Sequence, residues 1–258
     1  MNAELLTAHR VIAALECATG GSVQPTRVRA LSAVIIEELA ATAGGAPDDL
    51  IRSLLQNPQE PSSRRMISAA MVNETHFWRI PSHFEALRDD VFPRLAHEHP
   101  DRKIRVWSAA CSIGPEAWSV AMAAVDAAVL HRPGVEILAT DLDDSALELA
   151  RAGRCGRWAQ RGLLPEHADR WIQYDGEQAT VSHQLTDLIT FRNHNLLSPS
   201  PAGPFDVILC RNVLIYLSPA SRRLVFANLM AVLAPDGVLL VAPAELEHTS
   251  VHGFAINA

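Results

Sequence analysis

The segment Ile104-Arg-Val-Trp-Ser-Ala-Ala-Cys-Ser-Ile-Gly-Pro-Glu-Ala-Trp-Ser119 decides the fold, because a short apolar run passes into a loop of small residues and then into a helical pattern. Small side chains let backbone N–H groups approach a ligand closely. The positive end of the helix that follows favours an anionic group. Glu116 is expected to project from the first turn of this helix. The segment therefore predicts a strand, loop and helix that together hold a nucleotide-type cofactor.

A second apolar run, residues 135–140, ends in Asp141. An acidic side chain at the end of the second strand can accept hydrogen bonds from both hydroxyls of a ribose. The alternative interpretation is that Asp141 caps the helix that follows. Gly114 is the only glycine of the first loop, whereas a dinucleotide fingerprint carries three, which disfavours NAD. Two strand–helix units closed by Asp141 thus predict an adenosine site.

Three further motifs flank these two units. Asn73-Glu-Thr-His-Phe-Trp-Arg79 precedes them, while Asn195-Leu-Leu197 and Phe205-Asp-Val-Ile-Leu-Cys-Arg-Asn-Val-Leu-Ile-Tyr216 follow. In this order and spacing, over residues 60–250, the chain resembles the CheR-type chemotaxis receptor methyltransferases. The resemblance implies an α/β fold: a Rossmann-like methyltransferase sheet with a small N-terminal all-helical domain and a small inserted β-subdomain. It also implies methyl transfer from S-adenosylmethionine (SAM) to receptor glutamates, with S-adenosylhomocysteine (SAH) as product.

The same resemblance assigns cofactor contacts residue by residue. Asp141 matches the ribose-binding acid, and Glu116 lies near the methionine end, where a carboxylate can accept a charge-assisted hydrogen bond from the α-ammonium. Asn195 and Leu196 match positions beside the adenine, where an amide can read the purine edge. The full set of implied cofactor-binding residues is Asn73, Thr75, Arg79, Glu116, Asp141, Asn195, Leu196, Arg211 and Asn212.

Arg79 and Tyr216 are the implied catalytic residues. Thr75 and Arg79 lie four residues apart, so a helical turn would put them on one face, and an ordinary surface helix is the alternative. By resemblance, Arg79 engages the carboxylate of the incoming substrate. Tyr216 follows a buried strand, at the sheet edge where such folds bind ligands; its alternative is a core aromatic. Because a glutamate carboxylate is already ionised at neutral pH, both residues would align reactants and move no proton.

Composition narrows the class of protein. A chain of 258 residues with 48% apolar content can bury one α/β core and carry a small extra domain. The net charge of −7 disfavours nucleic acid as a partner. We expect a cytoplasmic protein without direct membrane insertion, because no leader pattern is present and no run reaches the roughly 18 apolar residues that span a bilayer. The four scattered cysteines predict reduced structural thiols and no metal site.

Periodicity divides the chain into two domains. Residues 1–65 are expected to form the helical domain, with the proline-containing stretch 57–65 as its exposed linker, and residues 66–258 the methyltransferase domain. Strands alternate with helices in the second domain, which predicts a parallel sheet. The alternation breaks at 153–188, the expected inserted subdomain. The expected strands are 104–108, 135–140, 189–193, 205–210 and 237–242, and the expected helices are 82–95, 115–129, 144–152 and 219–233.

Three functions are considered, and two departures from the family pattern support the third. Ile113 and Pro115 stand where the family usually has a threonine and a glutamate. The leading hypothesis is O-methylation of glutamates in the cytoplasmic domain of a chemoreceptor-like protein. The second is methylation of a small carboxylic acid, and the third is a catalytically weakened regulatory module that binds SAM or SAH. The shortened 153–188 segment also predicts no docking of a receptor tail peptide by strand addition.

The C-terminus leaves little chain for the last strand of this fold, which normally returns antiparallel between the two preceding strands. After Ala242 only residues 243–258 follow. An unpaired sheet edge exposes backbone groups and apolar side chains. We therefore expect a truncated seventh strand: either the chain is a fragment of a longer protein with a further C-terminal module, or the segment 254–256 pairs as a short substitute.

Overall fold

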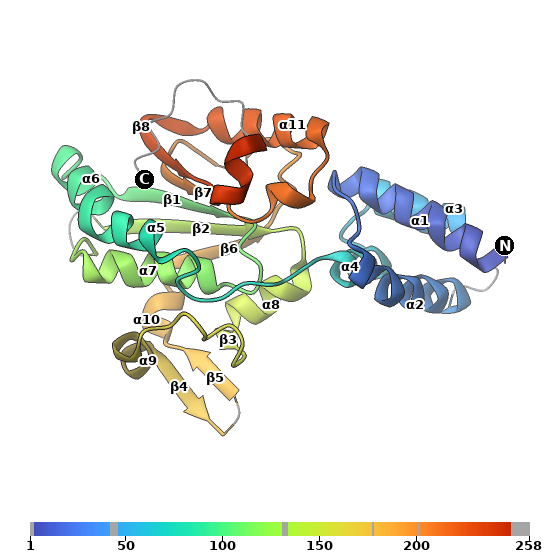
Figure 1. The fold of residues 1–258 in the computed structure, drawn as a ribbon, viewed down its shortest axis with the longest axis horizontal. Helices are drawn as coiled ribbons and strands as arrows, with labels where there is room; N and C mark the ends of the chain where they lie inside the picture. Colours follow the sequence, from blue (N-terminus) through green and yellow to red (C-terminus); the bar gives the residue numbers. More distant parts are fainter. Residues whose placement is uncertain (1–2, 42–45, 131–133, 177, 201, 249–258) are drawn as a thin grey trace.

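The computed structural model describes residues 3–41, 46–130, 134–176, 178–200 and 202–248 (Figure 1). The N-terminal helices are α1 (Ala3–Thr19), α2 (Pro25–Ala41), α3 (Pro47–Gln56) and α4 (Pro61–Ala70). They enclose a core of their own, to which Leu15, Leu31, Ile35 and Leu54 contribute fully buried side chains. In Figure 1 these helices lie together at one end of the molecule.

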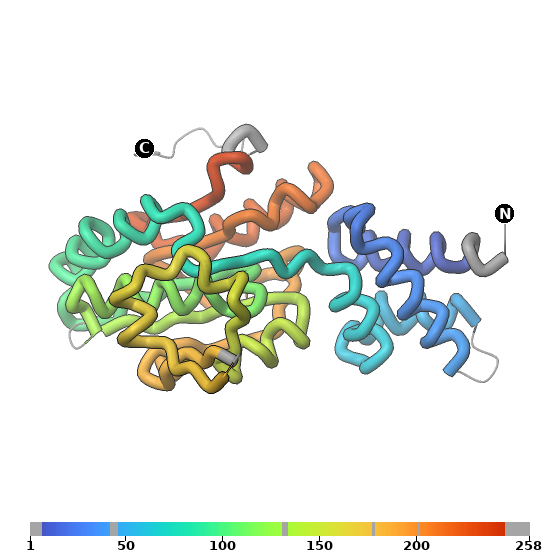
Figure 2. Tube along the Cα trace, turned by 60° about the horizontal axis from the view of Figure 1, so that its bottom comes forward, coloured from blue at the N-terminus to red at the C-terminus, as the bar shows by residue number. Residues whose placement is uncertain are grey.

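The expected linker at 57–65 is only partly a linker. Pro61 begins α4, where its missing N–H costs nothing because the first amides of a helix have no partner within it. Met66 and Ile67 of that helix are buried in the helical domain. The helical unit therefore continues to Ala70, and residues 71–76 form the extended connection that Figure 2 shows running to the second domain.

A five-stranded parallel sheet forms the centre of the second domain. Its strands are β1 (Ile104–Ala109), β2 (Val135–Asp141), β6 (Ile189–Asn193), β7 (Phe205–Leu209) and β8 (Leu233–Leu240), in the order β6-β2-β1-β7-β8. The chain proceeds outward from β1 first in one direction and then, at β7, in the other. The α/β, Rossmann-like fold class is confirmed, and the switch between β1 and β7 marks the edge where such sheets bind ligands.

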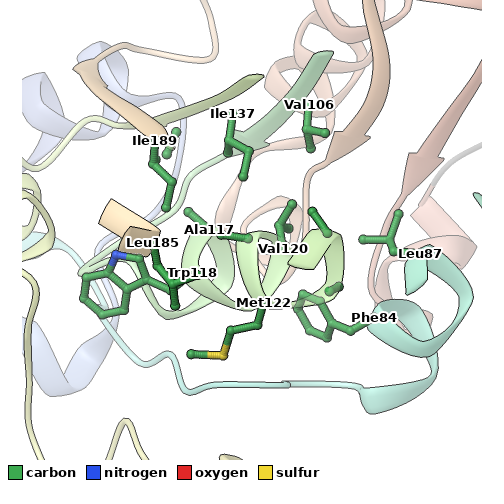
Figure 3. Close-up of a cluster of buried hydrophobic side chains, with 14 of the residues drawn as sticks. Phe84, Leu87, Val106, Ala117, Trp118, Val120, Met122, Ile137, Leu185 and Ile189 are labelled. Carbon is green, nitrogen blue, oxygen red and sulfur yellow. The ribbon is translucent and has the colours of Figure 1, made fainter. Parts of the chain in front are cut away.

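Helices cover both faces of this sheet. One face packs on α7 (Pro115–Asp126), α8 (Asp144–Arg151) and the helical segment 81–98, and the other on α11 (Pro219–Met230). Side chains alternate along β1 accordingly, because Val106 faces α7 and Trp107 faces α11. Figure 3 shows Val106 and Ile137 above α7, with Phe84 and Leu185 at its two ends.

Two expected elements differ from the sequence prediction. The helix expected at 82–95 consists of α5 (Pro81–Ala86), the π-helical turn η1 (Leu87–Val91) and α6 (Phe92–Glu98). Pro93 explains the interruption, since a proline inside a helix donates no hydrogen bond and its ring clashes with the preceding turn. The strand expected at 237–242 begins earlier, at Leu233, with an irregular register against β7 between Phe205 and Val207.

A small antiparallel sheet is inserted between β2 and β6. Its strands are β3 (Arg154–Cys155), β4 (Ile172–Asp175) and β5 (Gln178–Val181), in the order β3-β5-β4, with the helices α9 (Pro165–Trp171) and α10 (His183–Thr186). Figure 1 shows β4 and β5 projecting away from the main sheet, beyond α7 and α8. We refer to residues 153–188 as the inserted subdomain.

The last described element is the 3-10 helix η3 (Pro243–His248). Within the described part of the chain β8 forms the edge of the sheet, and its side chains are only half-buried or exposed. The substitute strand expected at 254–256 lies outside the described residues. None of the helices in the described ranges is both long enough and apolar enough to span a bilayer.

Ile137→Ala should lower the free energy of unfolding by about 2–5 kcal/mol, because Ile137 is fully buried on β2 and its truncation leaves a cavity against α7. Ile36→Ala is the matched control: Ile36 of α2 is 49% exposed, so its loss should change stability by less than about 0.5 kcal/mol. Urea unfolding followed by circular dichroism measures both. Equal effects would contradict the assignment of the core.

Candidate active site

A single cleft of about 1230 Å³, which includes space open to solvent, lies between the helical domain and the carboxyl ends of the main-sheet strands. Segments far apart in the sequence line it: residues 19–24 and 70–76 from one side, and the loops after β1, β2, β6 and β7 from the other. The cleft brings together every residue that the sequence nominates for the site: Asn73, Thr75, Arg79, Glu116, Asp141, Asn195, Leu196, Arg211, Asn212 and Tyr216.

The loop after β1 has an unusual backbone. Ala110 and Ser112 adopt left-handed conformations, with φ of 68° and 53°, and Gly114 follows at 102°. The amides of this loop donate within the protein, since Ser112 bonds to the Asp141 carboxylate and Gly114 to the Cys111 carbonyl. Only glycine fits at position 114, because the Cβ of any other residue would lie 2.8 Å from the Trp118 ring. The loop is tied to β2 by the hydrogen bond from the Cys111 amide to the Thr140 carbonyl, at 2.9 Å.

Asp141 lies at the end of β2 and reaches this loop. Its Oδ2 accepts from the Ser112 amide at 2.7 Å, and its Oδ1 accepts from the Asp143 amide at 2.9 Å. Burial raises the pKa of Asp141 to about 6, although these backbone N–H groups act in the opposite direction. The cap of α8 is Asp143, whose side chain accepts from the Ser145 and Ala146 amides. Asp141 therefore does not cap the helix and presents a buried acceptor to the cleft.

Glu116 and Arg211 form a buried ionic pair beside Asp141. Glu116, in the first turn of α7, accepts from the Ser108 hydroxyl at 2.7 Å and lies 3.6 Å from Nη1 of Arg211. Burial raises the pKa of Glu116, and the charge of Arg211 opposes this rise. The Arg211 guanidinium packs on the Phe84 ring and donates from Nη2 to the Arg79 carbonyl. Burial also lowers the pKa of Arg211 from its ordinary value.

Two nitrogens of Arg211 make no hydrogen bond within the described part of the chain. Its Nε and Nη1 are buried and make no hydrogen bond to any described residue, while the side chain is only 1% exposed. An unsatisfied buried donor is costly, and the cost is higher when the group is charged. Arg211 and Glu116 both line the cleft. Arg211 can bind the carboxylate of an amino acid, and Glu116 can bind its ammonium.

Asn73 connects the extended segment to both strand ends. Its Nδ2 donates to Oδ2 of Asp143 at 2.7 Å, and its Oδ1 accepts from the Ser112 hydroxyl at 3.1 Å. The amide group therefore uses both of its polar atoms within the protein. Asn73 thus lines the cleft and also connects the two loops that carry Ser112 and Asp143.

Thr75 and Arg79 lie in a loop, which corrects the expectation of a helical turn. Trp78 and Ile80, on either side of Arg79, are left-handed, with φ of 52° and 63°, so the chain reverses direction around Arg79. Nη1 of Arg79 donates to the Glu74 carbonyl at 2.7 Å. The side chain is half-buried and lines the cleft, with the rest of its donors available to a ligand.

Asn195 has a structural role beyond the expected one. Its Nδ2 donates to the Ala18 carbonyl at 2.9 Å, which connects the loop after β6 to the helical domain, and its Oδ1 accepts from the Leu197 amide at 3.0 Å. Only one N–H of the amide is left for a purine edge. Leu196 lines the same part of the cleft and can cover an adenine face.

Tyr216 lies at the end of the 3-10 turn η2 (Leu214–Tyr216) and is half-buried at the cleft wall. Its carbonyl accepts from the Ser22 amide at 3.0 Å, and Gly21 pairs with Leu217. A Cβ on Gly21 would lie 2.6 Å from the Tyr216 carbonyl oxygen, so only glycine permits this contact. The helical domain is therefore joined directly to the segment that carries Tyr216.

Glu245 is a site residue that the sequence prediction did not assign. It is fully buried, and its carboxylate accepts from the amides of Asn212 and Leu214 at 2.8 Å and from that of Ala242 at 3.0 Å. These bonds hold Asn212 in its left-handed conformation, with φ of 59°. The signal in the sequence was an acid three residues after the last expected strand.

Ile113 and Pro115, the two departures from the family pattern, lie away from the site. Ile113 packs against the main hydrophobic core, and Pro115 occupies the first position of α7, which suits its missing N–H. Neither side chain belongs to the cleft lining. The polar groups lost at these two positions therefore leave the described cleft wall unchanged.

Comparison with known proteins points to one family. The family model described as "CheR methyltransferase, SAM binding domain" matches residues 73–254. Chemotaxis protein methyltransferase 1 of Pseudomonas aeruginosa is 36% identical over 195 residues, which cover 72% of this chain and 71% of that protein. Chemotaxis protein methyltransferase 1 of Vibrio cholerae is 36% identical over 76% of this chain and 73% of its own. The probable biofilm formation methyltransferase WspC of Pseudomonas aeruginosa is 35% identical over 73% of this chain and 45% of its own.

Asp141→Asn should weaken SAH binding and remove a pH dependence. With a pKa of about 6, Asp141 is protonated at pH 5 and ionised at pH 7.5, and ribose hydroxyls bind best to the ionised form. The wild-type affinity should thus fall about tenfold at pH 5, one pH unit below this pKa. Isothermal titration calorimetry should show a smaller loss of SAH affinity between pH 7.5 and pH 5 for Asp141→Asn than for the wild type. Asp169→Asn, at an exposed position of α9, is the control and should behave as wild type. A wild-type affinity that is equal at both pH values would contradict the role of Asp141.

Proposed function

The chain belongs to the CheR methyltransferase family, and we propose that it methylates glutamate side chains of a chemoreceptor-like signalling protein. It is a SAM-dependent methyltransferase with a SAM-binding domain. The observation that carries the proposal is the buried Arg211, two of whose nitrogens make no hydrogen bond to a described residue, next to Glu116 and in one cleft with Asp141. The relatives named as chemotaxis protein methyltransferases support a receptor as the substrate.

The charged side chains of the cleft complement both the methionine part and the ribose of SAM. Arg211 and Glu116 suit the carboxylate and ammonium of its methionine part, and Asp141 suits the ribose hydroxyls. Ala110 and Ser112 of the left-handed loop line the same cleft and would contact the bound cofactor. Leu196 would cover the adenine. When bound, SAM supplies a methyl group on a cationic sulfur.

Arg79 and Tyr216 would hold the acceptor. The guanidinium of Arg79 can bind one oxygen of a glutamate carboxylate, which leaves the second oxygen free to attack. Tyr216 faces the same cleft from the segment after β7 and can donate a hydrogen bond. A new oxygen–carbon bond forms while the carbon–sulfur bond breaks, and its electron pair stays on the sulfur. Because no proton is transferred, alignment of the reactants limits the rate, and alignment is worth about 7–11 kcal/mol.

An assay of methyl transfer from tritiated SAM tests the proposal. Incubation with the cytoplasmic fragment of a chemoreceptor should give protein-bound label that base releases as volatile methanol, as expected for a glutamate methyl ester. Label on a small carboxylic acid alone would favour the second hypothesis. Tight SAH binding without any transfer would favour a regulatory module. Either of these results would overturn the proposal.

Arg79→Ala should lower kcat by about a hundredfold, because loss of orientation costs rate directly. Its effect on the dissociation constant of SAH should be smaller, because Arg211 and Glu116 would still bind the amino-acid part of SAH. The kcat of Arg79→Lys should lie between those of the wild type and Arg79→Ala, since the lysine ammonium keeps the positive charge and lacks the planar geometry of the guanidinium. Arg223→Ala, at an exposed position of α11, is the control. Equal losses in kcat and in SAH affinity for Arg79→Ala would contradict the orienting role.

A further inference from the structure

The loop that carries Arg79 depends on outside contacts for its shape. Trp78 and Ile80 both occupy the left-handed region, which is uncommon for any side chain and least suited to a β-branched one. Such conformations are unfavourable and persist only where the surroundings determine them. The contacts that hold residues 74–80 are therefore part of what places the Arg79 side chain.

The inserted subdomain supplies contacts along this loop. The Phe77 amide donates to the Ala159 carbonyl at 2.9 Å. Arg161 forms an ion pair with Glu74 at 3.0 Å. Gly162 packs so closely on the loop that a Cβ there would lie 2.0 Å from the Phe77 carbonyl oxygen.

The fourth contact is an aromatic stack on the residue next to Arg79. The His167 ring of α9 lies parallel to the Trp78 ring, with centroids 5.0 Å apart and planes 9° apart. Phe84 packs edge-on against Trp78 at 5.3 Å. The Trp78 amide donates to the Ser119 hydroxyl at 3.0 Å. Trp78 is thus held at its backbone and at its ring, and His167 is the part of this support that comes from the subdomain.

His167 is itself fixed by a carboxylate of the main domain. Its Nε2 lies 2.8 Å from Oδ2 of Asp126, at the end of α7, so Nε2 carries the proton that Asp126 accepts. The His167 side chain is 7% exposed. A buried imidazole with one ring nitrogen bonded has a fixed ring plane, and that plane is the surface on which Trp78 rests.

We propose that His167, oriented by Asp126, is a positioning residue for Arg79, through which the inserted subdomain sets the geometry of methyl transfer. The inference rests on the proposed function, because it takes Arg79 as the group that aligns the acceptor carboxylate. Asp126 and His167 fix the Trp78 ring, Trp78 fixes the backbone of the loop, and the loop fixes the direction of Arg79.

Steady-state kinetics with SAM and a chemoreceptor fragment, together with SAH titration, test the positioning role. His167→Ala should lower kcat by about tenfold, because a displaced Arg79 loses orientation, while the SAH dissociation constant stays unchanged. His167→Phe, which keeps a ring without the bond to Asp126, should restore part of kcat. His183→Ala, at an exposed position of α10, is the matched control and should equal wild type. A kcat of His167→Ala equal to wild type would overturn the proposal.

A double-mutant cycle and amide hydrogen exchange separate positioning from general stability. In an Arg79→Ala background, His167→Ala should have no further effect on kcat, whereas additive losses would overturn the proposal. Exchange in His167→Ala should rise at the Phe77 and Trp78 amides and stay unchanged in the strands of the main sheet. Exchange that rises everywhere, with kcat and SAH affinity falling together, would show a merely structural role and overturn it.

The same measurements distinguish failure of the proposed function from failure of this inference. Arg79→Ala with normal turnover would contradict the proposed role of Arg79. The restraint on the loop has its own readout, because hydrogen exchange needs no acceptor protein. Unchanged exchange at Phe77 and Trp78 in His167→Ala would overturn the restraint whatever the activity of the Arg79 variant.

Discussion

The ionic pair of Glu116 and Arg211 is the constraint on which the rest of the site depends. Burial of both charges is unfavourable, and at 3.6 Å the pair compensates this cost only in part. The two charges join three parts of the chain, because Glu116 lies in the first turn of α7, Arg211 follows β7, and Arg211 also donates to the carbonyl of Arg79. Because its buried Nε and Nη1 make no hydrogen bond to any described residue, Arg211 gains more from an anionic ligand than a solvated arginine would. The buried Arg211 therefore lowers the stability of the fold and raises the affinity for an anionic ligand.

The helical domain completes the cleft as well as covering it. Its turn after α1 bonds to the segment that carries Tyr216, and the Asn195 amide bonds back to Ala18. On its other side, Arg64 of α4 forms ion pairs with Asp144 and Glu148 of α8. These latter pairs are partly exposed and each contributes less than about 1 kcal/mol. The backbone pairing near Tyr216 is the more specific contact, because it admits only glycine at position 21.

The sequence could predict those parts of the site that local pattern determines. The strand, small-residue loop and helix around Gly114 place Glu116, and the end of the next apolar run places Asp141, because parallel strands end at one edge of a sheet. Glu245 could not be assigned in this way, since two of its three bonds go to Asn212 and Leu214, which are 33 and 31 residues earlier in the sequence. The left-handed backbone at Trp78 was also beyond prediction, because tryptophan has no local preference for it and distant contacts impose it.

Backbone strain in the described residues is concentrated at the cleft. Of the non-glycine residues with positive φ, all but Ala128 lie in the loops that form it: Trp78, Ile80, Ala110, Ser112 and Asn212. Three of them are held by a hydrogen bond from another part of the chain: Trp78 by Ser119, Ser112 by Asp141 and Asn212 by Glu245. The proposed methyl transfer to a carboxylate involves no proton transfer, so its rate is expected to depend on how rigidly the reactants are aligned. Loops held in unfavourable conformations by many buried bonds provide that rigidity, because any movement of the backbone would break several bonds at once.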